Sequence, residues 1–271
     1  MDYGTYPEES NWKKKYELTI PIILLILVGG VLAWQMGWLD FIPGIGEERV
    51  VDVLIVGEDR PLRDEIEGVG GVNVRMMGME EVKEIEEPGF IEDYEIIFLT
   101  EELGEEPGDL PSGFRSHVSE RLDDGTNLML YGVAGSRDPD EPQSDGWTQH
   151  GMGEYIPVEC PGTGVCDTEE VRTEYPGTFL TLSSRDPEHP VSEEFGPSYN
   201  IPDHIEDLTI SEMHIRDGSN RIYDIKIQNG GLDKQIPGIV ENSWTGGEAV
   251  YFAYHPAETP SVLRNTIEYI R

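Results

Sequence analysis

Apolar segments that alternate with helical patterns constrain the fold of this chain more than any other feature. The run RVVDVLIVG at residues 49–57 is almost continuously apolar and β-branched, which is typical of a parallel strand buried on both faces. Three more strands are predicted at residues 72–77, 93–101 and 126–133, and helices are predicted at residues 61–66 and 112–124. This pattern predicts an α/β fold with a doubly wound, flavodoxin-like and mostly parallel sheet.

The C-terminal part predicts a β-hairpin region. Residues 212–230 are expected to form a hairpin with its turn at residues 217–220, and residues 236–244 and 248–256 are expected to form two strands joined by Thr-Gly-Gly. A closing helix is predicted at residues 261–270. Residues 136–178 lack periodicity and are rich in Gly, Pro and acidic residues, which is typical of a functional or mobile loop.

Residues 18–39 form an apolar segment without a charged side chain. At about 1.5 Å rise per residue they would span about 33 Å, which is enough to cross a bilayer and too long for an ordinary core helix. Lysines precede this segment and acidic residues follow it, so the positive-inside rule predicts the orientation. We expect a cytoplasmic tail at residues 1–17, an uncleaved signal anchor at 18–39, a linker at 40–49 and an extracytoplasmic domain at 50–271.

The net charge of −35 comes from 19 basic and 54 acidic residues. This balance excludes nucleic acid as a partner, because phosphate neutralisation requires clusters of Lys and Arg. Such a charge would destabilise a compact fold at low ionic strength, but at about 1 M salt the screening length is only about 3 Å. We therefore interpret the acidity as the solvated surface of a halophilic protein. A calcium-loaded protein is the lesser alternative, since the spacing of a known calcium loop is missing.

The two cysteines, Cys160 and Cys166, flank a Pro/Gly turn that can bring them within bonding range. In an extracytoplasmic domain this arrangement predicts a disulfide. As metal ligands they would need two further partners, which no nearby motif supplies.

Neither a metal site nor a cofactor is predicted from the remaining polar residues. Several dispersed side chains could bind a cation, but their spacing does not favour a site. They are His150, His189, His204, His214, Asp138, Asp140, Glu141 and Asp145.

Four segments resemble the class I glutamine amidotransferase-like superfamily, especially its trehalose-utilisation-like and amidotransferase branches. They are RLDDGTNLMLYGVAG at residues 121–135, GWTQHGMGEYIPVEC at 146–160, DPEHPVSEEF at 186–195 and PGIVENSWTGGEAVYFAYHPAE at 237–258. The resemblance covers about residues 50–271. It implies a nucleophile elbow after the fourth strand, with a His and a Glu after the last one.

Two departures from the family pattern bear on catalysis. The working enzymes carry Gly-x-Cys-x-Gly at the elbow, whereas the aligned run at residues 132–136 places Ala134 where the Cys would be. His255 and Glu258 are also one residue further apart than the family's His-Pro-Glu. The resemblance therefore implies a non-catalytic domain that serves binding or scaffolding.

Ser136 offers an alternative, a hydrolase in which His255 is the base and Glu258 orients it, or one that uses a metal in the cleft. Ser136 stands two positions late on the turn and begins an Arg-Asp-Pro sequence, so a structural role is favoured. The residues expected to line a ligand-binding cleft are Gly132, Ala134, Ser136, Trp147 and His255.

The predicted partners are the membrane, through residues 18–39, and other envelope proteins or carbohydrate. Trp147, Trp244, Tyr251 and Tyr254 could stack on sugar rings, although aromatic residues in strands are more often core residues. A role as accessory subunit of a cell-envelope complex is a third hypothesis.

Overall fold

A computed structural model describes residues 49–85, 88–139, 146–161, 166, 171–175, 179–192, 197–201, 208–229 and 232–271. Residues Val50–Arg271 form one compact unit. The expected cytoplasmic tail, the signal anchor and nearly all of the linker lie outside the described residues. No helix within the ranges given above is long and apolar enough to cross a membrane.

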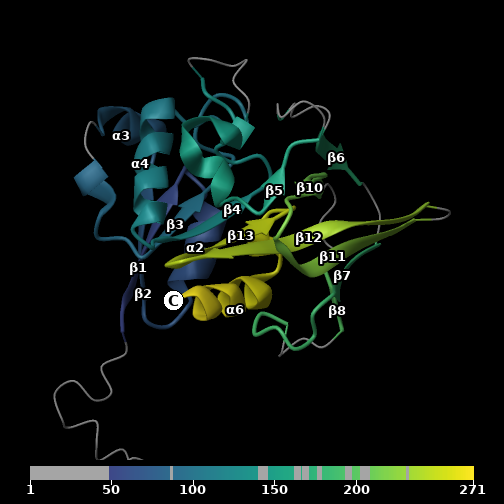
Figure 1. The fold of residues 1–271 in the computed structure, drawn as a ribbon. Helices are drawn as coiled ribbons and strands as arrows, with labels where there is room; N and C mark the ends of the chain where they lie inside the picture. The colour runs from purple at the N-terminus through teal and green to yellow at the C-terminus, as the bar shows by residue number, and fades with distance from the viewer. Residues whose placement is uncertain are drawn as a thin grey trace, which may run out of the picture. The chain divides into compact units, whose positions relative to one another are not determined.

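A nine-stranded sheet runs through this unit in the order β2-β1-β3-β4-β13-β12-β11-β7-β8 (Figure 1). Its first five strands are parallel: β2 (Val72–Met77), β1 (Val51–Val56), β3 (Ile96–Leu99), β4 (Asn127–Tyr131) and β13 (Gly247–Phe252). This strand order is that of a flavodoxin-like sheet, and it confirms the predicted α/β fold.

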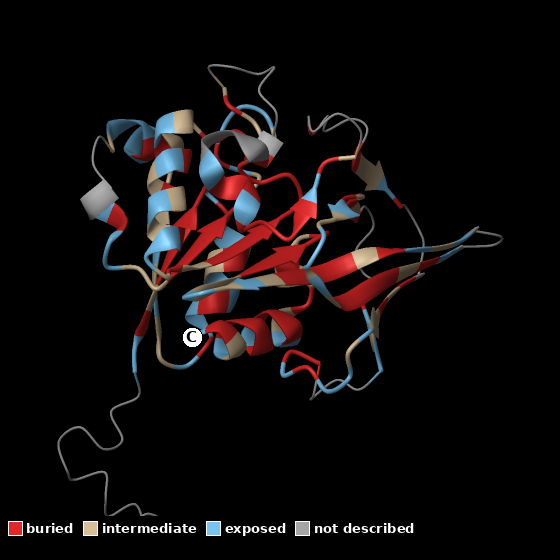
Figure 2. Ribbon diagram, viewed as in Figure 1, coloured by how far each residue is buried: buried red, intermediate tan, exposed pale blue. Residues whose placement is uncertain are grey.

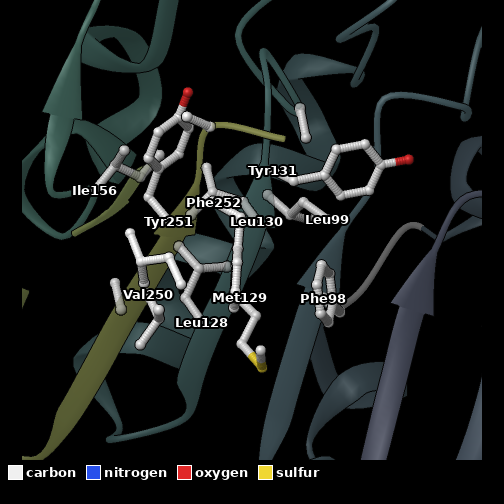
Figure 3. Packing of buried hydrophobic residues seen from close by; sticks show 14 of the residues in the cluster. Phe98, Leu99, Leu128, Met129, Leu130, Tyr131, Ile156, Val250, Tyr251 and Phe252 are labelled. Carbon is white, nitrogen blue, oxygen red and sulfur yellow. The ribbon is translucent and has the colours of Figure 1, made fainter. Parts of the chain in front are cut away.

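The centre of the parallel half is buried on both faces, as its apolar sequences predict. Every residue of β3 is buried, and so are residues 128–131 of β4. Figure 3 shows side chains of β3, β4 and β13 packed side by side. The edge strand β2 instead alternates between exposed and half-buried side chains, because only one of its faces is covered.

Helices cover both faces of the sheet, with α4 (Ser112–Asp123) on one side and α2 (Arg60–Glu67) and α6 (Pro260–Ile270) on the other (Figure 1). Each helix combines buried residues with exposed ones, as expected for helices with one face packed on a sheet (Figure 2). Two shorter elements complete this half, the helix α3 (Met79–Glu84) and the 3₁₀ turn η2 (Pro88–Ile91).

The antiparallel half consists of β12 (Leu232–Trp244), β11 (Asn220–Asn229), β7 (Phe179–Ser184) and β8 (Ser198–Asn200). The strands β11 and β12 form a long ribbon that projects beyond the parallel half (Figure 1). The predicted C-terminal β-hairpin region is therefore present as the antiparallel strands β11, β12 and β13.

The hairpin predicted within residues 212–230 is wrong. A turn does lie at Asp217 and Gly218, closed by the Ser219 N–H on the Arg216 carbonyl, and Gly218 has φ +92°. The strand before it, β10 (His214–Ile215), pairs with β5 (Val158–Glu159), whereas β11 pairs with β12. The long β11–β12 ladder buries Ile225 and Ile227, and a two-residue partner strand could not cover them.

The aperiodic segment at residues 136–178 packs against the domain where the structure describes it. Its 3₁₀ helix η3 (Gly146–Glu154) contacts α4 and buries Trp147 and Met152. Its strand β6 (Arg172–Glu174) pairs with β9 (Thr209–Ser211). The predicted disulfide is confirmed, since Cys160 and Cys166 are bonded with their Cα atoms 5.0 Å apart.

Candidate functional site

A cleft of about 270 Å³ lies at the carboxyl ends of the parallel strands, which is the edge where open α/β sheets bind ligands. Its wall combines charged and aromatic side chains with a few apolar ones. The residues that line it are Glu101, Glu102, Pro107, Tyr131, Gly132, Arg172, Leu208, Thr209, Ser211, Ala253, Tyr254, His255 and Glu258.

An imidazole–carboxylate pair lies at this cleft. His255 follows β13, and its Nε2 atom lies 2.9 Å from Oδ2 of Asp59, which follows β1. The Tyr131 hydroxyl donates to the same oxygen at 3.0 Å, and the other Asp59 oxygen accepts the Leu62 N–H as the N-cap of α2. The Asp59 side chain is fully buried. Hydrogen bonds from His255, Tyr131 and the Leu62 N–H hold its two oxygens.

Each member of the pair favours the charged form of the other. Burial alone would lower the pKa of His255, but the hydrogen bond and charge of Asp59 raise it above the ordinary value of 6.5. Burial alone would raise the pKa of Asp59, yet His255 and the N–H of Leu62 lower it below 3.8. Asp59 therefore occupies Nε2 of His255 and favours the protonated imidazole.

The chain turns directly after β4 at Gly132, whose φ is +59°, which is the place of a nucleophile elbow in the resembled family. In such an elbow the nucleophile stands on a sharp turn directly after the strand, and the next backbone N–H helps to form the oxyanion hole. Here that N–H belongs to Val133, and it donates to Oε1 of Glu101 at 2.7 Å. A Cβ atom on Gly132 would overlap the same oxygen. Oε1 of Glu101 therefore takes the space that a nucleophilic side chain at Gly132 would need. It also engages the N–H that would bind the oxyanion.

Glu101 is held in place by charge as well. Its Oε2 atom lies 3.4 Å from the guanidinium of Arg172, and its side chain is only 11% exposed. Burial raises the pKa of the Glu101 carboxyl, while Arg172 and the Val133 N–H oppose that shift. The strand that carries Arg172 is anchored in turn, because Tyr175 donates to Glu212 at 2.6 Å and Lys234 pairs with the same carboxylate.

The predicted cleft residues separate into two groups. Gly132 and His255 line the cleft, and so does Glu258 of the hydrolase alternative. Ala134, Ser136 and Trp147 are buried outside its lining, and the Ala134 carbonyl accepts the Trp147 indole N–H at 2.8 Å.

The structure therefore does not bring Ser136 to the cleft beside His255. The strand end and left-handed turn lie at Gly132, two residues before Ala134. Asp59, and not Glu258, holds the imidazole ring. Sequence reasoning missed Asp59, although an acidic residue between a buried strand and a Pro-started helix was a usable signal.

The other aromatic candidates are structural. Tyr251 and Tyr254 are almost completely buried, and the indole of Trp244 donates to the Leu122 carbonyl at 3.0 Å. Tyr254 lines the cleft, but its hydroxyl is hydrogen-bonded to Thr259 at 2.8 Å.

Across the described part of the chain, no three His, Cys, Asp or Glu side chains are placed to hold a metal ion. Among the expected cation ligands, His189 bonds to Glu241 at 3.0 Å and Asp138 pairs with Arg115 at 3.2 Å, while His214 is exposed. The other candidates, the side chain of His150 and residues Asp140, Glu141, Asp145 and His204, lie outside the description.

Solved structures share this fold at low sequence identity. No family model matches the chain, and no curated protein matches it significantly. A ThuA-like protein from Bacteroides uniformis matches with a TM-score of 0.53 and 10% identity, over 83% of this chain and 92% of that one. The chain has the fold of the ThuA-like proteins. This confirms the resemblance to the amidotransferase-like superfamily at the level of the fold.

Two other structures show how the fold occurs elsewhere. A cytoplasmic protein from Salmonella typhimurium LT2 matches with a TM-score of 0.58 and 13% identity, over 82% of this chain and 100% of that one. The E323A catalytic mutant of a GH42 β-galactosidase from G. stearothermophilus matches with a TM-score of 0.50 and 13% identity. That match covers 83% of this chain and 30% of the enzyme, so a fold similar to that of this chain also occurs as part of a larger protein.

Proposed function

We propose that this chain is a membrane-anchored, extracytoplasmic binding or scaffold protein of a halophilic organism, and that its amidotransferase-like domain is not catalytic. One observation carries the proposal. The carboxylate of Glu101 fills the elbow at Gly132, where the nucleophile and the oxyanion of an amidotransferase would have to lie.

Covalent acyl transfer needs a nucleophile, a base that accepts its proton and free donors for the developing oxyanion. Gly132 has no side chain, and the Val133 N–H is already engaged by Glu101. His255 is bonded through Nε2 to Asp59 and not to a nucleophile. Cys160 and Cys166 are joined in a disulfide away from the cleft lining. At the elbow the nucleophile is therefore missing and the oxyanion donor is engaged.

A binding role is supported by the cleft itself, which keeps a polar lining after the elbow has lost its nucleophile. A scaffold role is supported by the β-galactosidase match, because the same fold there makes up 30% of a longer chain. The two roles are compatible, since a bound ligand can bring other envelope proteins to an anchored domain.

Anchoring is supported by the apolar residues 18–39 and by the lysines that precede them. The disulfide between Cys160 and Cys166 supports an oxidising compartment for the domain. The net charge of −35 supports a high-salt environment, where self-repulsion is screened.

The test is a hydrolysis assay on the full chain in detergent, with glutamine, an activated ester and an aryl glycoside as substrates. We expect no turnover above the buffer rate, and no difference between the wild type and His255→Ala. Turnover that disappears in His255→Ala would overturn the proposal. Labelling by a serine-directed probe that is lost in Ser136→Ala would favour the hydrolase alternative instead.

A further inference from the structure

The charges in the cleft do not cancel. Asp59 pairs with His255 at 2.9 Å and Glu101 pairs with Arg172 at 3.4 Å, so each basic side chain in the lining already has a carboxylate partner. Glu102 and Glu258 also line the cleft, and neither forms a salt bridge with a described residue. The lining therefore carries two uncompensated negative charges.

The turn at Gly132 adds to the preference of the cleft for cations over anions. In an amidotransferase-like fold the N–H after the elbow is the natural donor for an anionic ligand atom. In this chain Glu101 accepts a hydrogen bond from that N–H at 2.7 Å and also forms a salt bridge with Arg172. An anion that entered the cleft would find its hydrogen-bond donors already engaged by Glu101, and it would be repelled by the remaining carboxylates. The cleft therefore disfavours anionic ligands.

The cleft lining also contains apolar side chains that can contact the hydrocarbon part of a ligand. Pro107, Leu208 and Ala253 lie in the same lining as the two free carboxylates. A space of about 270 Å³ is just below the usual range for ligand pockets, which run from about 300 to about 1,000 Å³. These walls suit a small molecule with methyl or methylene groups better than a bare ion.

We propose that the cleft binds a small organic cation, such as an amine or a quaternary ammonium compound, with Glu258 and Glu102 as its counter-charges. This inference rests on the proposed binding function and adds the chemical class of the ligand. Glu258 is the main partner, because it is half-buried while Glu102 is exposed.

The test is calorimetric titration of the full chain in detergent with choline and ethanolamine. Neohexyl alcohol, the uncharged carbon isostere of choline, and acetate serve as comparison ligands. The measurement is made in about 1 M KCl, where a screening length of about 3 Å suppresses loose attraction of cations to the acidic surface. The ring resonances of His255 report whether a ligand enters the cleft.

We expect choline or ethanolamine to bind and to shift the His255 resonances, and neohexyl alcohol to bind at least about tenfold more weakly than choline. Glu258→Gln should weaken cation binding about tenfold, equivalent to about 1.4 kcal/mol. The matched control is Glu268→Gln on the exposed face of α6, which should leave binding unchanged.

Equal binding of choline and neohexyl alcohol would overturn the inference, and so would full binding by Glu258→Gln. Failure of both cations to bind would overturn it as well. If acetate or the alcohol shifts the His255 resonances, the binding function stands and only the ligand class is wrong. The proposal that the domain is not catalytic is tested separately, by the hydrolysis assay that compares the wild type with His255→Ala.

Discussion

Oε1 of Glu101 lies in the space that a side chain on Gly132 would need, and it accepts the Val133 N–H at 2.7 Å. The two residues are 31 positions apart in the chain, at the ends of neighbouring strands β3 and β4. Because Glu101 fills the elbow, replacing Gly132 by a nucleophile would not create a working site.

Gly132→Ala should destabilise the protein by about 1–3 kcal/mol, because Ala is strained at φ +59° and its Cβ would overlap Glu101. Gly218→Ala is the matched control: its φ is +92°, but no atom lies within 4 Å of the added Cβ. Urea unfolding measures the free energy of unfolding of each variant.

The overlap itself is tested by adding Glu101→Ala to Gly132→Ala. The double variant should recover part of the loss, because the carboxylate no longer competes with the new Cβ. Equal losses in the two glycine variants, together with additive effects of Glu101→Ala and Gly132→Ala, would contradict the proposed contact.

The Asp59–His255 pair should stabilise the fold within a defined pH window. The raised pKa of His255 gives stability that is complete below 6.5 and is lost as the pH rises through the folded-state value. The lowered pKa of Asp59 gives stability that is complete above 3.8 and is lost as the pH falls through its folded-state value. The contribution is therefore largest between 3.8 and 6.5.

Asp59→Asn should lower the pKa of His255 and remove this maximum, since an amide keeps an acceptor for the Leu62 N–H but carries no charge. An NMR titration of the His255 ring measures the first effect, and urea unfolding at several pH values measures the second. Asp217→Asn, in an exposed turn, is the control. An unchanged His255 titration in Asp59→Asn would show that the pair does not set this pKa.

Glu101→Gln should remove a separate pH dependence, whose sign is opposite to that of Asp59 and the same as that of His255. Burial raises the pKa of Glu101 above 4.5, so the folded state holds this proton more tightly and stability falls as the pH rises through the folded-state value. Gln cannot ionise and keeps an oxygen for the Val133 N–H, so the fall should disappear. Urea midpoints from about pH 4 to about pH 8 would show it. Loss of the same slope in Glu268→Gln would mean that Glu101 is not its source.

Removing the disulfide should lower the free energy of unfolding by about 2 kcal/mol, as expected for the short loop between Cys160 and Cys166. The double variant Cys160→Ser with Cys166→Ser, unfolded in urea, provides the measurement. An unchanged stability would mean that the cross-link does not restrict the unfolded chain.

The same cysteines test the membrane orientation. A membrane-impermeant thiol reagent, applied to intact cells after reduction, should label Cys160 and Cys166 in the wild type and leave the double Ser variant unlabelled. Labelling that requires cell lysis would place the domain on the cytoplasmic side and refute the proposed topology.

Stability should rise strongly between about 0.1 M and about 1 M KCl, because screening weakens the repulsion among 54 acidic side chains. Urea unfolding at increasing KCl measures the effect, and NaCl should reproduce it if screening is the cause. Stability that does not depend on salt would argue against the halophilic interpretation.

Local sequence signals were sufficient for most of the elements. The buried strands β1, β3 and β4, the helix α4 and the disulfide loop were all predictable, because apolar periodicity, capping residues and turn chemistry act over a few neighbouring positions. Gly132 and His255 were also named as cleft residues, since the ends of parallel strands converge at one edge of a sheet.

The tertiary structure alone decided how charges and strands pair. Asp59 meets His255 across 196 positions of the chain, and Glu101 meets the elbow because β3 and β4 are neighbours. The partner of β11 was likewise settled by which strand could cover its buried isoleucines. Sequence patterns determined which segments form strands and helices. Burial and long-range pairing then determined that an acidic side chain, and not a nucleophile, occupies the elbow.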